Sequence, residues 1–70
     1  MLTTPTPRSS SIGAVGYDAQ NNELQINFKT GGKYIYEKVP EHIYADFMAA
    51  SSMGRYFWAN IRSFYNYKRV

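Results

Sequence analysis

The chain has 70 residues and no cysteine, which excludes a disulfide, a thiolate zinc site and a thiol nucleophile among its residues. The length suits one small domain, which buries only about 60% of the surface that its unfolded chain exposes. Eight Lys and Arg against five Asp and Glu give a net charge of +3, which favours an anionic or acidic partner. Seven Tyr, four Phe and one Trp are more rings than so small a core needs, so we expect some of them at the surface.

Residues 1–10 are mostly Thr, Pro and Ser, and their apolar surface is too small to offset the entropy lost on ordering. We therefore expect a flexible N-terminal arm over residues 1–10, followed by a single domain over residues 11–70. Residues 11–18 are expected to form a first strand. Gly13 and Gly16 interrupt it and predict a bulge or a close approach of another backbone.

Residues 23–29 have the clearest strand pattern, because apolar and polar side chains alternate along them. The two glycines of residues 30–32 reverse the chain, and residues 33–39 return as a third strand. The fold class that we expect is α+β, a three-stranded antiparallel β-meander packed against one or two C-terminal helices.

The helices are expected from Pro40 to about Arg62, where the apolar period changes to about 3.6 residues. For residues 64–70 three outcomes stay open: a frayed end, a longer helix or a short strand. The side chains expected in the core are Leu24, Ile26, Phe28, Ile43, Phe47, Phe57 and Ile61.

The register of the hairpin decides the role of Tyr34 and Tyr36. A three-residue loop pairs Phe28 with Tyr34 and puts both tyrosines on the buried face. A two-residue turn puts them on the other face, where exposed rings could stack on bases. We favour the first register, because it leaves an outer face that is polar apart from Ile35.

No arrangement of residues indicates an enzyme or a metal site. His42 is the single histidine, whereas a zinc site needs three or four ligands and a serine nucleophile needs an oriented base. Gly31-Gly32 precedes a strand and lacks the Lys and Ser/Thr of a phosphate-binding loop. We therefore expect no catalysis and no cofactor.

Four side chains share the outward side of the second expected helix: Arg55, Trp58, Arg62 and, if the helix continues, Tyr65. Trp, Tyr and Arg dominate the hot spots of protein interfaces, and the tail adds Lys68 and Arg69. These six residues are our candidate partner-binding surface. The alternative is that Trp58 packs beneath the first strand or the C-terminal tail, because fully exposed Trp is uncommon.

The chain carries F-x-x-G-G-x-Y-x-Y, then V-P, a helix, S-x-G-R-Y-F and I-R followed by Tyr. The residues of this pattern are Phe28, Gly31, Gly32, Tyr34, Tyr36, Val39, Pro40, Ser52, Gly54, Arg55, Tyr56, Phe57, Ile61, Arg62 and Tyr65. The order and spacing resemble the KTSC domain family, over about residues 11–69. Trp58 departs from the family pattern, in which a small polar residue is more usual.

The family is named for an appendage of some lysyl-tRNA synthetases, and it also occurs as small free-standing proteins of bacteria and phages. The resemblance implies a small non-enzymatic regulator that binds the bacterial transcription machinery through a basic aromatic surface. RNA polymerase is the first candidate for the partner. The alternative that it implies is a module for single-stranded RNA or tRNA. We expect a monomer in the cytoplasm (the host cytoplasm if phage-encoded), with no membrane association, because no apolar run reaches the length of a membrane span.

Overall fold

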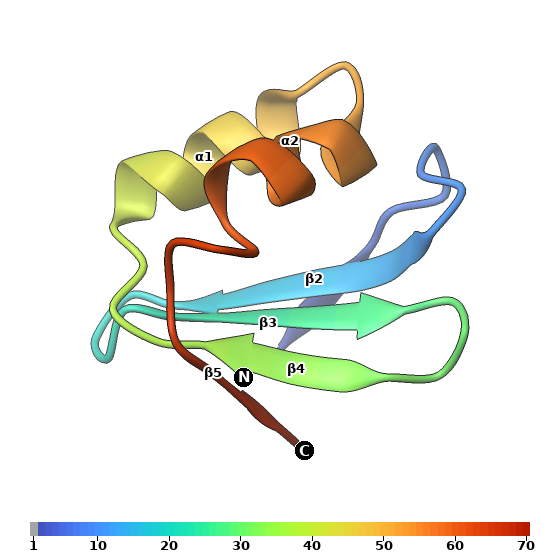
Figure 1. Cartoon of the computed structure of the whole chain (residues 1–70). Coiled ribbons are helices and arrows are strands. Elements are labelled where there is room, and N and C mark those ends of the chain that lie inside the picture. Colours follow the sequence, from blue (N-terminus) through green and yellow to red (C-terminus); the bar gives the residue numbers. More distant parts are fainter. Residues whose placement is uncertain (1) are drawn as a thin grey trace.

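Within residues 2–70, which the computed structural model describes, five strands form one antiparallel sheet, and two helices lie across one face of it (Figure 1). The elements in chain order are β1 (Thr3–Pro5), β2 (Ile12–Asp18), β3 (Glu23–Phe28), β4 (Lys33–Tyr36), α1 (Glu41–Ala49), α2 (Met53–Asn60) and β5 (Tyr67–Arg69). The strand order in the sheet is the order along the chain. The α+β class is confirmed, with a sheet on one side and a helical layer on the other.

The expectation of three strands followed by C-terminal helices is wrong. Both helices lie between β4 and β5, and the chain then returns to the sheet, where β5 pairs with β4. Two backbone bonds flank this pairing: Glu37 N–H donates to Asn66 O (2.8 Å), and Val70 N–H donates to Lys33 O (2.9 Å). The short strand was therefore the right one of the three outcomes left open for the tail.

Strand β1 lies in the segment that we expected to be a flexible arm. It pairs with β2, and Gly16 stands opposite Thr3. A Cβ at Gly16 would lie 2.6 Å from Leu2 O, so only glycine allows this backbone to come so close. The close approach expected at Gly16 is confirmed, whereas the mobility of residues 2–10 stays a prediction. The part of that expectation concerning Met1 lies outside the described residues.

The bulge expected in β2 is also present, because the register with β3 shifts between Ile12 and Ala14. The extra residue is Gly13, and it turns both Ile12 and Val15 to the buried face although they are three positions apart.

The β3–β4 hairpin pairs Ile26 with Tyr34 and Leu24 with Tyr36. Gly31 N–H donates to Phe28 O (2.9 Å), and Gly31 has a φ of 107°, which glycine adopts readily. The expected pairing of Phe28 with Tyr34 is therefore wrong by two residues. Because side chains alternate with a period of two, both tyrosines still face the helices.

The helices begin at residues that suit a helix start. Pro40 is the N-cap of α1, and the Ser52 side chain accepts from Arg55 N–H at the start of α2. The hydrophobic core between the helices and the sheet consists of Ile12, Val15, Leu24, Ile26, Tyr36, Val39, Phe47, Met53, Phe57 and Ile61. Five of the seven expected core residues are in this list, and the other two, Phe28 and Ile43, pack against it partly buried.

Tyr17 connects the end of β2 to the loop before α1. Its hydroxyl donates to Val39 O (2.6 Å) and accepts from the Asn22 side chain (3.0 Å). Its ring stacks on Tyr44 of α1, with centroids 4.7 Å apart and planes 8° from parallel. This contact fixes the first helix over the β2 end of the sheet. In the part of the chain that is described, neither helix is long and apolar enough to cross a membrane.

Candidate docking site

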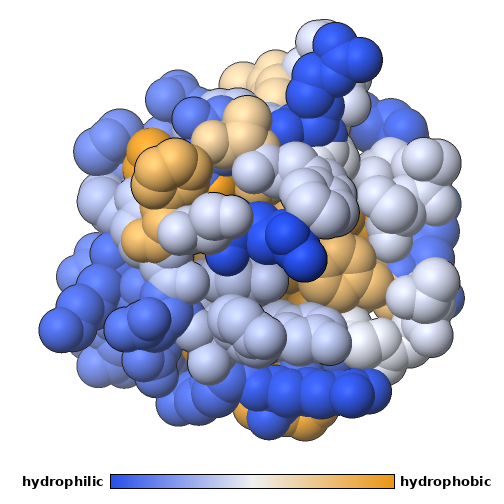
Figure 2. Space-filling model, viewed as in Figure 1, coloured by the Kyte–Doolittle hydropathy of each residue, from blue (hydrophilic) through white to orange (hydrophobic). Residues whose placement is uncertain are grey.

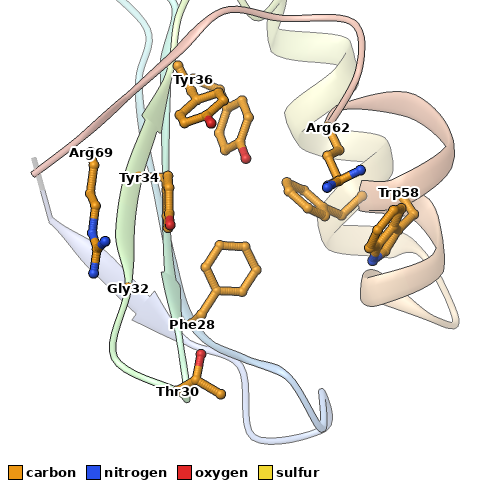
Figure 3. Close-up of a pocket in the computed structure, with 10 residues that line it drawn as sticks. Phe28, Thr30, Gly32, Tyr34, Tyr36, Trp58, Arg62 and Arg69 are labelled. Atoms are coloured by element: carbon orange, nitrogen blue, oxygen red, sulfur yellow. The ribbon is translucent and has the colours of Figure 1, made fainter.

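A hollow of about 550 Å³ opens between α2 and the strands β3, β4 and β5 (Figure 3). Its lining consists of Phe28, Thr30, Gly32, Tyr34, Tyr36, Phe57, Trp58, Arg62, Tyr67 and Arg69. Six of these ten residues are aromatic, two are arginines and none is acidic. In the space-filling view, apolar surface shows between paler and more polar side chains in the middle of this face (Figure 2).

Because side chains alternate between the two faces along each strand, the sheet places four aromatic rings in the lining, namely Phe28, Tyr34, Tyr36 and Tyr67. Tyr34 stands opposite Arg69 and Tyr36 opposite Tyr67, so all four side chains share the helix-facing side of β4 and β5. The Tyr34 ring meets Phe28 edge to face (5.7 Å between centroids) and Tyr67 likewise (5.5 Å). The rings therefore hold one another in place, as edge-to-face aromatic pairs do.

Helix α2 supplies the opposite wall. Met53, Phe57 and Ile61 face the core, as the sequence predicts, and Phe57 packs edge to face on Tyr36 at 5.5 Å. Trp58, the next residue, is 62% exposed. The alternative that Trp58 packs beneath a strand or the tail is therefore wrong.

Arg62 lies just beyond α2, where the chain turns back toward the sheet. The amides of Ile61 and Arg62 both donate to Phe57 O (3.0 and 2.9 Å), and these two bonds to one carbonyl close the last turn of α2. This turn brings the guanidinium carbon of Arg62 to 3.9 Å from the centre of the Trp58 ring. On the strand side, the guanidinium carbon of Arg69 lies 5.8 Å from the Tyr34 ring centre. Both arginines are thus held against aromatic faces, within cation–π range.

The electrostatics of the hollow are set by these two cations. Neither Arg62 nor Arg69 pairs with a carboxylate within residues 2–70, where the recorded ion pair is Lys68 with Glu23 (3.7 Å). Burial raises the pKa of the Tyr36 hydroxyl, and the neighbouring Tyr67 and Tyr34 act in the same direction. Tyr36 is therefore neutral at physiological pH, and the lining carries positive charge alone.

The structure brings together three of the six residues expected at the binding surface, namely Trp58, Arg62 and Arg69. Arg55 is exposed on α2 but does not line the hollow, and Tyr65 is half-buried against the core. Lys68 points to the other face of the sheet, because it alternates with its two neighbours on β5.

The proximity of the sheet tyrosines to Trp58 was not among the features expected from the sequence. The available signal was the alternation of Tyr67 and Arg69, which matches that of Tyr34 and Tyr36 and indicates a strand pair sharing one face. Elsewhere, His42 is exposed, and within residues 2–70 no three His, Asp or Glu side chains gather as metal ligands would.

These features define a small α+β domain with an open aromatic and cationic recess beside its second helix. Residues 8–69 match the model of the KTSC domain, and the chain belongs to this family. A crystal structure of a KTSC domain protein from Yersinia pestis superposes with a TM-score of 0.94 at 36% identity, covering 99% of this chain and 96% of that one.

Two further proteins are similar to this chain in sequence. An uncharacterized protein of Stutzerimonas stutzeri (strain A1501) is 38% identical over 50 residues, which are 71% of this chain and 70% of the relative. A protein of Tsukamurella paurometabola is 42% identical over 48 residues, which are 69% and 72% of the two chains. The resemblance noted in the sequence is thus confirmed at the level of the family.

Proposed function

We propose that this KTSC domain is a small non-enzymatic regulator that docks on bacterial RNA polymerase through the aromatic hollow. The observation that carries the proposal is Trp58, a large ring that is 62% exposed and held under the guanidinium of Arg62. Exposing so large a ring leaves apolar surface in water, and such surface marks an interaction site when other apolar groups adjoin it. Docking on the polymerase would place the protein in the bacterial cytoplasm.

The chemistry of the recess suits a protein partner. Trp, Tyr and Arg are the residue types that dominate interface hot spots, and hot spots lie in pockets from which water is expelled. Trp58 and Arg62 supply two of these types at one rim, and Tyr34 and Tyr36 supply the third on the facing strand. RNA polymerase as the partner is what the family resemblance implies.

The test is a titration of RNA polymerase with three forms of the protein: the unchanged chain, Trp58→Ala and Phe64→Ala. Phe64 is a matched control, because it is 68% exposed and does not line the hollow. We expect Trp58→Ala to weaken binding by about 2 kcal/mol or more, the hot-spot range, with no change from Phe64→Ala. Equal affinity of all three forms would place the docking surface elsewhere, and absence of binding would remove the polymerase as partner.

Substitutions of two arginines test whether charge at the rim of the hollow contributes to docking. Arg62→Ala should slow association and reduce its salt dependence, because a charge at the rim of an interface steers encounter. Arg55→Ala is the matched control, since Arg55 is an exposed arginine of α2 that does not line the hollow. An equal effect of both substitutions would extend the docking surface along α2.

The second candidate function is binding of single-stranded RNA, which is favoured by rings that lie beside guanidinium groups. Base stacking gives about 1–3 kcal/mol per base in such sites. Among residues 2–70, the cations that line the hollow are Arg62 and Arg69, so the slope of log K against log salt should be no steeper than about −1.4, at about 0.7 per phosphate contact. Nuclease treatment of the polymerase preparation separates the two functions, because binding to the protein survives it.

A further inference from the structure

We propose that the occupant of the hollow is an acidic protein segment that inserts one aromatic side chain between carboxylates. The proposal rests on the proposed function insofar as it takes the partner to be a protein, and it adds the chemistry of the segment that is bound.

The size of the hollow fits one large side chain and the backbone beside it. Its volume of about 550 Å³ lies within the range of about 300–1,000 Å³ that is typical of ligand pockets. The floor is apolar, because Phe57 is buried beneath it and Phe28 stands at the hairpin end (Figure 3). An inserted ring would complete an aromatic cluster whose members already meet edge to face.

The charges of the recess select an anionic neighbour for that ring. Arg62 and Arg69 lie at opposite sides of the ring cluster, and neither pairs with a carboxylate within residues 2–70 (Figure 3). A guanidinium binds a carboxylate bidentately, so two separated arginines suit carboxylates that flank an inserted side chain on both sides. The same two cations oppose a methylammonium guest, although aromatic cages are otherwise suited to one.

The ring geometry favours a side chain over a run of stacked bases. Single-stranded nucleic acid stacks on ring faces that are open to solvent. Here Tyr34 is flanked by Phe28 and Tyr67, and the Trp58 face carries Arg62. A recess that is concave and partly self-covered accepts one inserted group more readily than a continuous strand.

Trp58 is the single tryptophan of the chain, and its emission therefore reports the hollow alone when the probe contains no tryptophan. The probe is a short capped peptide with one Phe between pairs of Asp. Three control probes are the peptide with Ala for Phe, the peptide with Lys for Asp, and oligouridylate. Emission and acrylamide quenching are recorded for each probe at low salt.

We expect the Asp–Phe–Asp peptide to shift the Trp58 emission to the blue and to protect it from acrylamide. The Ala peptide should bind at least about fivefold more weakly because it lacks the ring that fills the hollow. The Lys peptide should bind at least about fivefold more weakly because its charges are repelled by both arginines of the hollow. Arg62→Gln and Arg69→Gln should each reduce this preference for the acidic peptide, whereas Arg55→Gln should not. A melting curve for each variant shows that the fold is retained.

Several results would overturn the proposal: no binding of the acidic peptide, equal binding of the Asp and Lys peptides, or binding of oligouridylate alone, which would identify an RNA site. Its failure is separable from that of the proposed function. Loss of polymerase binding on Trp58→Ala together with peptides that do not discriminate by charge refutes the acidic occupant and leaves the docking function standing. An acid-selective hollow in a protein that ignores the polymerase refutes the docking function alone.

Discussion

The guanidinium of Arg62 covers the indole of Trp58, with the guanidinium carbon 3.9 Å from the ring centre. The two residues are four positions apart, and the turn that ends α2 allows the pairing. Such a contact is worth about 0.5–1 kcal/mol at an exposed site. The contact also restricts the conformations of both side chains before a partner binds. Less side-chain entropy is therefore lost on binding.

Phe57 and Trp58 are neighbours in sequence with opposite roles in stability. Phe57 is 5% exposed and Trp58 is 62% exposed, so Phe57→Ala should reduce the free energy of unfolding by about 3–5 kcal/mol. Trp58→Ala should leave the thermal midpoint nearly unchanged. Melting curves of the two variants check this, and a Trp58 variant as unstable as the Phe57 variant would mean that Trp58 is a core residue.

Much of the fold follows from the sequence, because its signals are local. The alternation around Leu24 and Ile26 and the apolar stripe of Met53, Phe57 and Ile61 depend on the period of each element, and both are as expected. The edge strands β1 and β5 are three residues long and polar or exposed. Their place in the sheet depends on pairing with another strand. The composition of β1 does not indicate a strand, and the alternation of Tyr67 and Arg69 indicates a strand without showing its partner.

The sequence predicts the part of the candidate site that depends on local spacing, and it does not predict the part that depends on strand pairing. Trp58 lies in the last turn of α2 and Arg62 just beyond it, so their spacing of four positions in sequence is a local signal of their proximity. Tyr34, Tyr67 and Arg69 reach the same recess only through the β4–β5 register. Lys68 lies on the other face of the sheet from the hollow, because a strand sends alternate residues to opposite faces and a count of basic residues in the tail does not distinguish the two faces.

Tyr17→Phe should reduce the free energy of unfolding by about 1–3 kcal/mol, because it leaves Val39 O without its side-chain donor in a half-buried position. Tyr44→Phe is the matched control: it keeps the stacked ring, and no hydrogen bond of the Tyr44 hydroxyl is recorded in residues 2–70. Urea unfolding of both variants measures the difference. Equal stability of the two would show that the Tyr17 hydroxyl bond contributes nothing.

Gly16→Ala should detach β1 from the sheet, because the added Cβ would lie 2.6 Å from Leu2 O. Gly13→Ala is the control in the same strand, since its Cβ would meet Asn27 O at 3.4 Å, close to an ordinary contact. Heteronuclear NOE values at the amides of Thr3 and Thr4 are the measurement, because Pro5 has no amide proton. They should fall in the Gly16 variant, whereas low values already in the unchanged protein would support the flexible arm expected from composition.

Stability should fall at alkaline pH because of Tyr36. Burial, with Tyr67 and Tyr34 nearby, raises the pKa of its hydroxyl above the ordinary value of about 10. The folded state then keeps the proton when the unfolded state has lost it, so this contribution is complete below about pH 10 and is lost as the pH rises further. Urea unfolding at rising pH should show a smaller loss for Tyr36→Phe, with a residual slope from Tyr56, whose pKa burial also raises. An identical pH profile for Tyr36→Phe would contradict this assignment.

The central claim is that a partner protein sits in the hollow, and site-specific photo-crosslinking tests it most directly. A photoreactive phenylalanine analogue replaces Thr30, an exposed residue of the lining at the β3–β4 turn, or Gln20, an exposed residue of the β2–β3 turn at the other end of the sheet. With RNA polymerase as the partner, we expect a crosslinked product from position 30 and none from position 20. A complex that forms normally but crosslinks only from position 20 would show that the partner binds away from the hollow.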